Sequence, residues 1–140
     1  MKKTALVPIP AKTADSEKIT INLGFVDLGQ IDLLVAEGFY SNRTDLIRTA
    51  IRNHLGGHAD TLKQVAARKM LVLGLQYFSS DDLKAVMAAK QKLQIRVLGL
   101  ATIAYDVTPE LAQATIASIE VLGALHASPA VKTALAGRLR

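Results

Sequence analysis

A short stretch of strict alternation near the start of the chain constrains the fold most. From Lys18 to Leu23, polar and apolar side chains alternate, and the run ends at Gly24. This period of two predicts a half-buried β-strand with an apolar face of Ile19, Ile21 and Leu23 and a polar face of Lys18, Thr20 and Asn22. No second strand follows within the next thirty or so residues, so one copy leaves its backbone groups and apolar face unpartnered. The pattern therefore predicts that two copies pair.

Two helical patterns follow this strand. Apolar residues at helical spacing (Leu28, Ile31, Leu34, Val35) predict a first helix that is capped by Asp27 and ends at Gly38. Ser41 is expected to cap a second helix, whose apolar stripe (Leu46, Ile47, Ala50, Ile51, Leu55) stops at Gly56-Gly57. A strand and two helices are too small for a core of their own. We expect a two-fold dimer that buries the apolar strand face and leaves the polar face open.

The order and spacing of these elements resemble a known family. Glu17-Lys-Ile-Thr-Ile-Asn-Leu, then Ile31-Asp-Leu-Leu-Val, then Gly38-Phe-Tyr-Ser-Asn-Arg-Thr-Asp-Leu-Ile-Arg-Thr-Ala-Ile-Arg are similar to the ribbon-helix-helix regulators of the Arc, MetJ and CopG kind. The resemblance covers about residues 17–55. It implies an intertwined dimer whose two-stranded antiparallel ribbon enters the major groove of DNA. One departure is Gly24-Phe25, where the family often has proline after the strand.

The same resemblance assigns candidate DNA-binding residues. Lys18, Thr20 and Asn22 would read bases, because lysine donates to guanine, asparagine pairs with adenine, and threonine offers a hydroxyl and a methyl group. The turn before the second helix resembles the family's phosphate clamp, with Ser41, Asn42 and Arg43 as its residues. The alternative for the strand residues is a merely solvated face. For Arg48 and Arg52 we favour a solvated face over phosphate contacts.

The C-terminal half contains a repeat. Val72-Leu73-Gly74, Val97-Leu98-Gly99 and Val121-Leu122-Gly123 recur at intervals of 25 and 24 residues. Each copy precedes a helix cap (Ser79 or Ser80, Thr108-Pro109, Ser128-Pro129) and apolar positions (Leu83, Val86, Met87; Leu111, Thr115, Ile119; Val131, Leu135). This predicts about three parallel β/α units stacked like a short solenoid, with strands around the three valines. An ordinary small α/β domain is the alternative.

The predicted fold class is therefore α+β, divided into four segments. Residues 1–16 are expected to be a flexible arm, 17–55 the ribbon-helix-helix domain, 56–60 a linker, and 61–140 the β/α repeat domain. Three repeats would form a sheet with two open edges, and self-association would cover them. We therefore expect higher homo-oligomers through residues 61–140, with a ligand pocket in that region as the rival interpretation.

Several classes of protein are disfavoured. No cysteine is present, charged residues interrupt the most apolar segments, and the net charge of +5 is compatible with a nucleic-acid partner. His54 and His58 are four residues apart, but Gly56-Gly57 should separate their rings, and His126 stands alone. Asp81-Asp82 suits a helix start better than a catalytic pair. We predict a cytoplasmic protein that is not an enzyme, binds no cofactor or metal, and does not enter a membrane.

The predicted function is sequence-specific binding of double-stranded DNA by a homodimer, most simply as a transcriptional repressor. Two alternatives are a plasmid partition protein that binds a centromere and a DNA-organising assembly protein. An antitoxin that represses its own operon ranks third, because its C-terminal segment would be short and would fold on a toxin.

Overall fold

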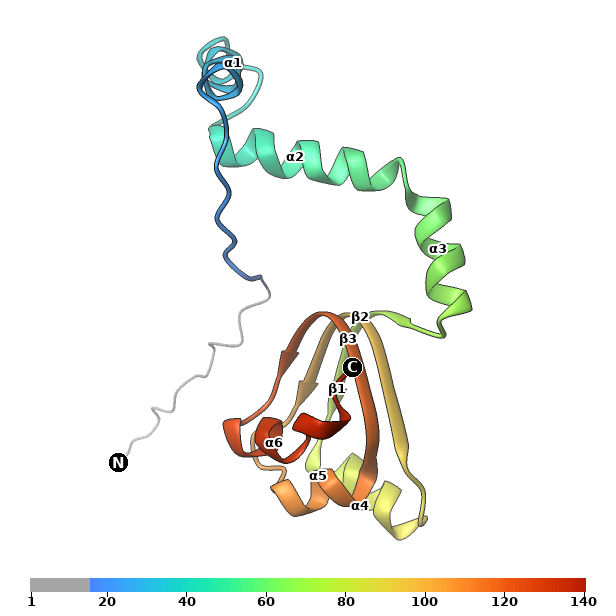
Figure 1. The fold of residues 1–140 in the computed structure, drawn as a ribbon. Helices are drawn as coiled ribbons and strands as arrows, with labels where there is room; N and C mark the ends of the chain where they lie inside the picture. The colour runs from blue at the N-terminus through green and yellow to red at the C-terminus, as the bar shows by residue number, and fades with distance from the viewer. Residues whose placement is uncertain (1–15) are drawn as a thin grey trace, which may run out of the picture. The chain divides into compact units, whose positions relative to one another are not determined.

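The computed structural model describes residues 16–140, which form an α+β chain with six α-helices and one parallel sheet of three strands (Figure 1). The chain divides into two compact units, Met1–Thr61 and Leu62–Arg140. Residues 1–15, which include nearly all of the predicted arm, lie outside the described part. None of the helices in residues 16–140 is long and apolar enough to cross a bilayer.

The first unit contains helices α1 (Phe25–Ala36) and α2 (Arg43–Gly56). Gly24 is the N-cap of α1 and makes no side-chain cap, so the prediction that Asp27 caps this helix is wrong. Asp27 instead lies in the first turn, where the helix dipole favours an acidic side chain. At the other end Gly38 has a φ of +87°, as its predicted place after the helix requires.

Helix α2 starts one residue later than expected. Asn42, not Ser41, is its N-cap, and the Asn42 side chain accepts a hydrogen bond of 2.8 Å from the backbone N–H of Asp45. The helix ends at Gly56, where the two glycines were expected to stop it. A further helix, α3 (Ala59–Arg68), begins almost at once, although a linker was predicted over residues 56–60.

The second unit confirms the predicted repeat. Strands β1 (Val72–Phe78), β2 (Leu93–Ile103) and β3 (Ile116–His126) are parallel and adjacent in that order. Val72, Val97 and Val121 pair in one row, and the three glycines pair in the row two residues on. Helices α4 (Ser80–Ala88), α5 (Pro109–Thr115) and α6 (Pro129–Ala134) follow the strands, and a short 3₁₀ turn, η2 (Ala136–Arg138), ends the fold.

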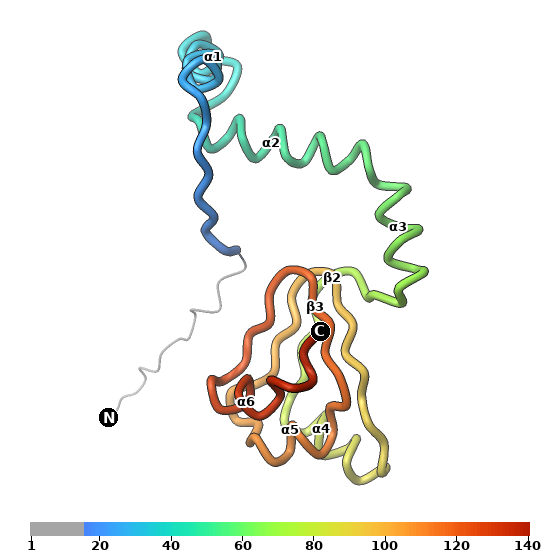
Figure 2. The backbone as a smooth tube through the Cα atoms, viewed as in Figure 1, coloured from blue at the N-terminus to red at the C-terminus, as the bar shows by residue number. Residues whose placement is uncertain are grey.

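The glycine row bends the sheet into an arch. Strands β2 and β3 each turn back at mid-length (Figure 2), and Gly74, Gly99 and Gly123 have φ values of +122°, +142° and +125°. Only glycine adopts such angles readily. A Cβ atom on Gly99 would also overlap the carbonyl oxygen of Gly74, and one on Gly123 would overlap that of Gly99. The strand of each β/α repeat therefore consists of two short straight segments joined by a bend, as in a solenoid.

The core of the second unit lies inside the arch. Val97 and Ile103, on either side of the bend, are fully buried, as are Leu83 of α4 and Val131 of α6. Ile119, which we expected on a helix with Leu111 and Thr115, is instead a buried residue of β3, because α5 ends at Thr115.

The three helix caps of the repeat are those predicted. The side chains of Ser79, Thr108 and Ser128 each accept a hydrogen bond from the backbone N–H three residues on. Asp82 completes a capping box by accepting from the backbone N–H of Ser79, which lowers the pKa of Asp82. A structural role thus accounts for Asp82.

One edge of the sheet is covered in part by the chain itself. Leu139 forms a parallel bridge with Ile119 of β3, and the backbone N–H of Arg140 donates to the Ile119 carbonyl at 2.9 Å. The Arg138 guanidinium donates to the carbonyl oxygens of Gln113 and Ile116 and holds this tail in place. The expectation of two open edges is therefore corrected in part, because the last residues cover the β3 edge at Ile119.

Candidate nucleic-acid interface

The predicted strand is exposed on both faces. Residues 17–24 form no strand pairing with any other described part of this single chain. Lys18, Thr20 and Asn22 are exposed, but Ile19 and Ile21 are also 72% and 57% exposed. One chain therefore brings the three candidate base-reading residues to the surface without covering the apolar side of the same segment.

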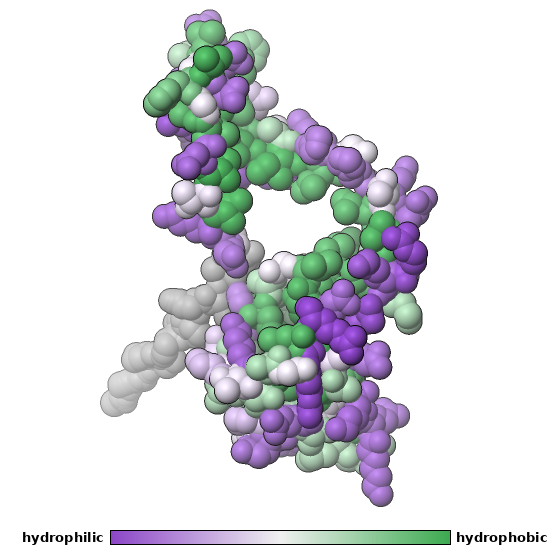
Figure 3. All heavy atoms as spheres, viewed as in Figure 1, coloured by the Kyte–Doolittle hydropathy of each residue, from purple (hydrophilic) through white to green (hydrophobic). Residues whose placement is uncertain are grey.

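Helices α1 and α2 bury none of their residues. Large apolar side chains on and beside them stay in contact with solvent, and Figure 3 shows these apolar atoms over α1 and the segment before it. The exposed set is Leu23, Phe25, Val26, Leu33, Leu34, Phe39, Ile51 and Leu55. Contiguous apolar surface of this kind marks a site of association.

The start of α2 presents backbone N–H groups. The first N–H groups of the helix, those of Arg43 and Thr44, have no carbonyl within the helix to which they can donate. The N–H of Ser41 is already used, because it donates to the Asp45 carboxylate at 2.9 Å. Of the predicted clamp residues, Ser41 and Asn42 thus make local capping bonds, while the helix end keeps the donors that attract an anion.

Arg43 has a partner that sequence reasoning missed. Its Nε and Nη2 atoms donate to the two carboxylate oxygens of Asp32 on α1, both at 2.8 Å. This hydrogen bond lowers the pKa of Asp32 and raises that of Arg43. Asp32 falls among the polar positions of the predicted first helix, and the bidentate geometry suits arginine. The pair joins α1 to α2 in one chain.

Two arginines that we had placed on a solvated face lie beside this helix start. A shallow groove is lined by Ser41, Asn42, Thr44, Asp45, Arg48 and Arg52. Within the described residues neither Arg48 nor Arg52 makes an ion pair. Their spacing of four residues was the signal in the sequence, since it puts both on one side of a helix.

The histidine pair differs from the expectation. The rings of His54 and His58 lie edge to face with centroids 5.1 Å apart, so Gly56-Gly57 does not separate them. The helical backbone continues through Gly56, and Gly57 keeps right-handed angles, which preserves the spacing of one turn. No group of three or more possible metal ligands occurs in residues 16–140.

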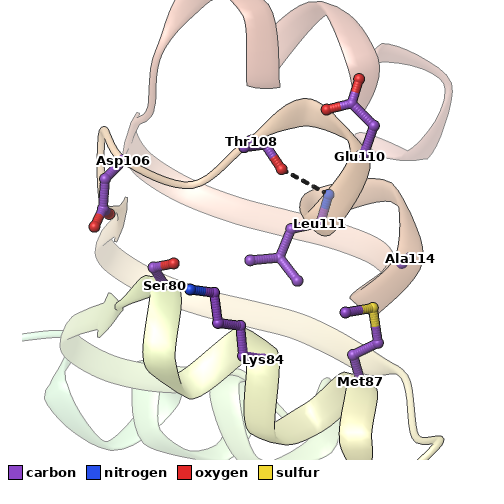
Figure 4. Close-up of a pocket in the computed structure, with 8 residues that line it drawn as sticks. All are labelled: Ser80, Lys84, Met87, Asp106, Thr108, Glu110, Leu111 and Ala114. Atoms are coloured by element: carbon purple, nitrogen blue, oxygen red, sulfur yellow. Dashed lines mark hydrogen bonds between the residues drawn. The ribbon is translucent and has the colours of Figure 1, made fainter.

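The rival ligand pocket has a counterpart in a groove between α4 and α5 (Figure 4). Ser80, Lys84 and Met87 form one wall, and Glu110, Leu111 and Ala114 form the other. The nearby Thr108 hydroxyl is already bonded to the Leu111 N–H at 3.1 Å. The lysine, the methionine and the glutamate are exposed, and this groove lacks the buried polar groups that orient a small ligand.

Comparison with known proteins identifies the family. The chain matches the Ribbon-Helix-Helix transcriptional regulator family over residues 14–132 and belongs to it. The match runs beyond the strand and two helices, through most of the β/α repeats in which we recognised no family. No curated protein and no solved structure matched the chain.

Proposed function

We propose that this protein is a transcriptional repressor that binds DNA as a homodimer through residues 17–55. The family is one of DNA-binding regulators without enzymatic activity. The observation that carries the proposal is the unburied state of α1, α2 and the segment before them. Two copies of residues 18–24, paired as an antiparallel ribbon, would cover Ile19, Ile21 and Leu23 against the helices of both chains.

The other face of that ribbon would contact the bases. Lys18, Thr20 and Asn22 from both chains would enter the major groove as six side chains, and their chemistry matches the edges of guanine, thymine and adenine. The unpaired N–H groups of α2 would meet the phosphates on either side, with Ser41, Asn42 and Arg43 at the contact. A phosphate that binds Arg43 must share it with Asp32.

The C-terminal unit would join such dimers into larger assemblies on the DNA. Residues 61–140 have a core of their own, so this unit can present an interface while the first unit holds its operator. A plasmid partition protein or a DNA-organising protein uses the same parts on longer arrays of sites, and an antitoxin is the third candidate. All of these act on DNA in the cytoplasm.

Selection of binding sites from random DNA, followed by titration of variants, tests the proposal. We expect Thr20→Ala and Asn22→Ala to weaken binding to the selected site by about 1–3 kcal/mol for each base pair misread. The affinity of each variant for random DNA should stay within about twofold of that of the unmodified protein, because contacts with bases contribute little to nonspecific affinity. Equal losses on both DNAs would contradict the assignment of these two residues.

The phosphate contact has its own test. Arg43→Ala should weaken binding to all sequences and reduce the slope of log affinity against log salt by about two, about one for each copy of Arg43 in the dimer. Asp32→Ala is the matched control, because it breaks the same ion pair but leaves the arginine in place. If the two variants lower affinity equally with an unchanged salt slope, Arg43 only braces the helices.

A further inference from the structure

The two edges of the sheet differ. The edge of β3 is occupied in part by Leu139 and Arg140, whereas β1 pairs only with β2 within the described residues. Three large side chains on one face of β1 are largely in solvent: Leu73 is 74% exposed, Leu75 76% and Tyr77 64%. An edge strand with this apolar surface is a template for another strand.

The glycine bend limits what can pair there. At Gly99 and Gly123 the missing Cβ would point at the carbonyl oxygen of the glycine in the preceding strand. Gly74 lies on the edge strand, so it has no preceding strand. A Cβ atom on Gly74 would have no other atom within 4 Å. The φ of +122° alone explains why this residue is glycine. The space beside Gly74 is open, so no described atom of this chain blocks another backbone there.

We propose that β1 pairs with β1 of a second copy of this chain, antiparallel, with Gly74 opposite the partner's Gly74. A straight strand follows the edge on one side of the bend only, so the partner strand must be bent as well. Within residues 16–140 such strands are β1, β2 and β3, of which β2 is internal and the β3 edge is covered in part. The remaining partner is β1 itself.

Two-fold symmetry then fixes the register. An axis through the bend maps the half of β1 before Gly74 onto the half after it, which makes the strands antiparallel and the contact closed. Leu73 comes opposite the partner's Leu75, and these leucines extend the rows that they form with Leu98 and Leu100. The result is one arched sheet of six strands. This inference rests on the proposed assembly role of the second unit but not on DNA binding.

Cysteine pairs in the full chain test the register. The chain has no cysteine, so each introduced thiol is unique. Leu73→Cys and Leu75→Cys chains are co-expressed and oxidised mildly. Directly opposite residues lie about 5 Å apart between Cα atoms and can form a disulfide, whereas diagonal neighbours at about 7–8 Å cannot. We expect the mixture to form cross-linked heterodimers at least about ten times faster than either variant alone.

The outcomes separate the alternatives. The matched control combines Leu73→Cys with Leu122→Cys, which occupies the same row on β3, and should not cross-link. Cross-linking in that control would indicate head-to-tail pairing of β1 with β3 of the next copy. Cross-linking of one variant alone would indicate another register of β1 against β1. No cross-linking at all would indicate that the β1 edge is open or covered differently. Each overturns the inference. DNA binding of the same proteins is measured alongside, so failure of the function shows separately. The mass of the cross-linked protein under native conditions is measured as well, and a mass of only two chains would contradict larger assemblies but not the strand pairing.

Discussion

The two units of this chain differ in what they bury within a single copy. In the second unit, strands and helices close over a continuous apolar core that includes Leu83, Val97, Ile103 and Val131. In the first unit, neither α1 nor α2 buries a residue, although both carry apolar stripes. The second unit thus has a core within one chain, whereas in the proposed dimer the first unit would obtain its core from a second chain. Folding and dimerisation of the first unit should therefore be one event.

The largest expected effect is on the coupling between folding and dimerisation of the first unit. Ile21→Asp puts a charge on the face that the dimer buries, and each copy loses about 1.5–3 kcal/mol of apolar burial. Two copies per dimer should raise the dissociation constant at least about a hundredfold. Hydrogen exchange should then show α1 and α2 unprotected and β1–β3 protected. Thr20→Ala, on the other face of the same segment, is the control. If Ile21→Asp leaves the helices protected, the first unit has a core that does not need the strand.

A second comparison lies within the sheet of the second unit. Val97 is fully buried and Leu122 is 49% exposed, although both belong to the repeated Val-Leu-Gly motif. Val97→Asp should destabilise this unit by about 3–5 kcal/mol, because it buries an unpaired charge. Leu122→Asp should cost only about 1 kcal/mol, since half of its surface is already in water. Thermal unfolding of the two variants tests this, and equal losses would mean that the outer face of β3 is covered.

Much of this arrangement could be predicted from the sequence because short-range patterns determine it. The Val-Leu-Gly repeat placed the three strands, and Ser79, Thr108 and Ser128 placed the helices after them. Period and capping are local properties, and they hold wherever the element lies. The same reasoning placed the N-cap of α2 to within one residue and the end of α1 to within two, but it placed the N-cap of α1 three residues too late.

What could not be predicted depends on contacts distant in the sequence. The Arg43–Asp32 pair needs the angle between two helices, and the cover on the β3 edge needs the last residues to turn back. The arch needs glycine angles that a Val-Leu-Gly motif does not specify, since glycine also fits a flat strand. For the candidate interface, the alternation of polar and apolar residues placed Lys18, Thr20 and Asn22 on one face, but which face meets DNA depends on a second chain.

The smallest expected effect concerns the ion pair that joins α1 to α2. The hydrogen bond from Arg43 lowers the pKa of Asp32 below its usual value of 3.8, so the folded first unit binds a proton at Asp32 less readily than the unfolded chain does. The stabilisation is therefore complete above pH 3.8 and disappears as the pH falls through the lowered pKa. Both side chains are about half exposed, so salt should weaken it as well. Asp32→Asn removes the titrating group, and the unfolding midpoints of the two proteins should differ at pH 7 and converge in acid. A difference of the same size at every pH, with no decrease in acid, would mean that the asparagine disturbs α1 itself and that the loss of the ion pair is not the cause.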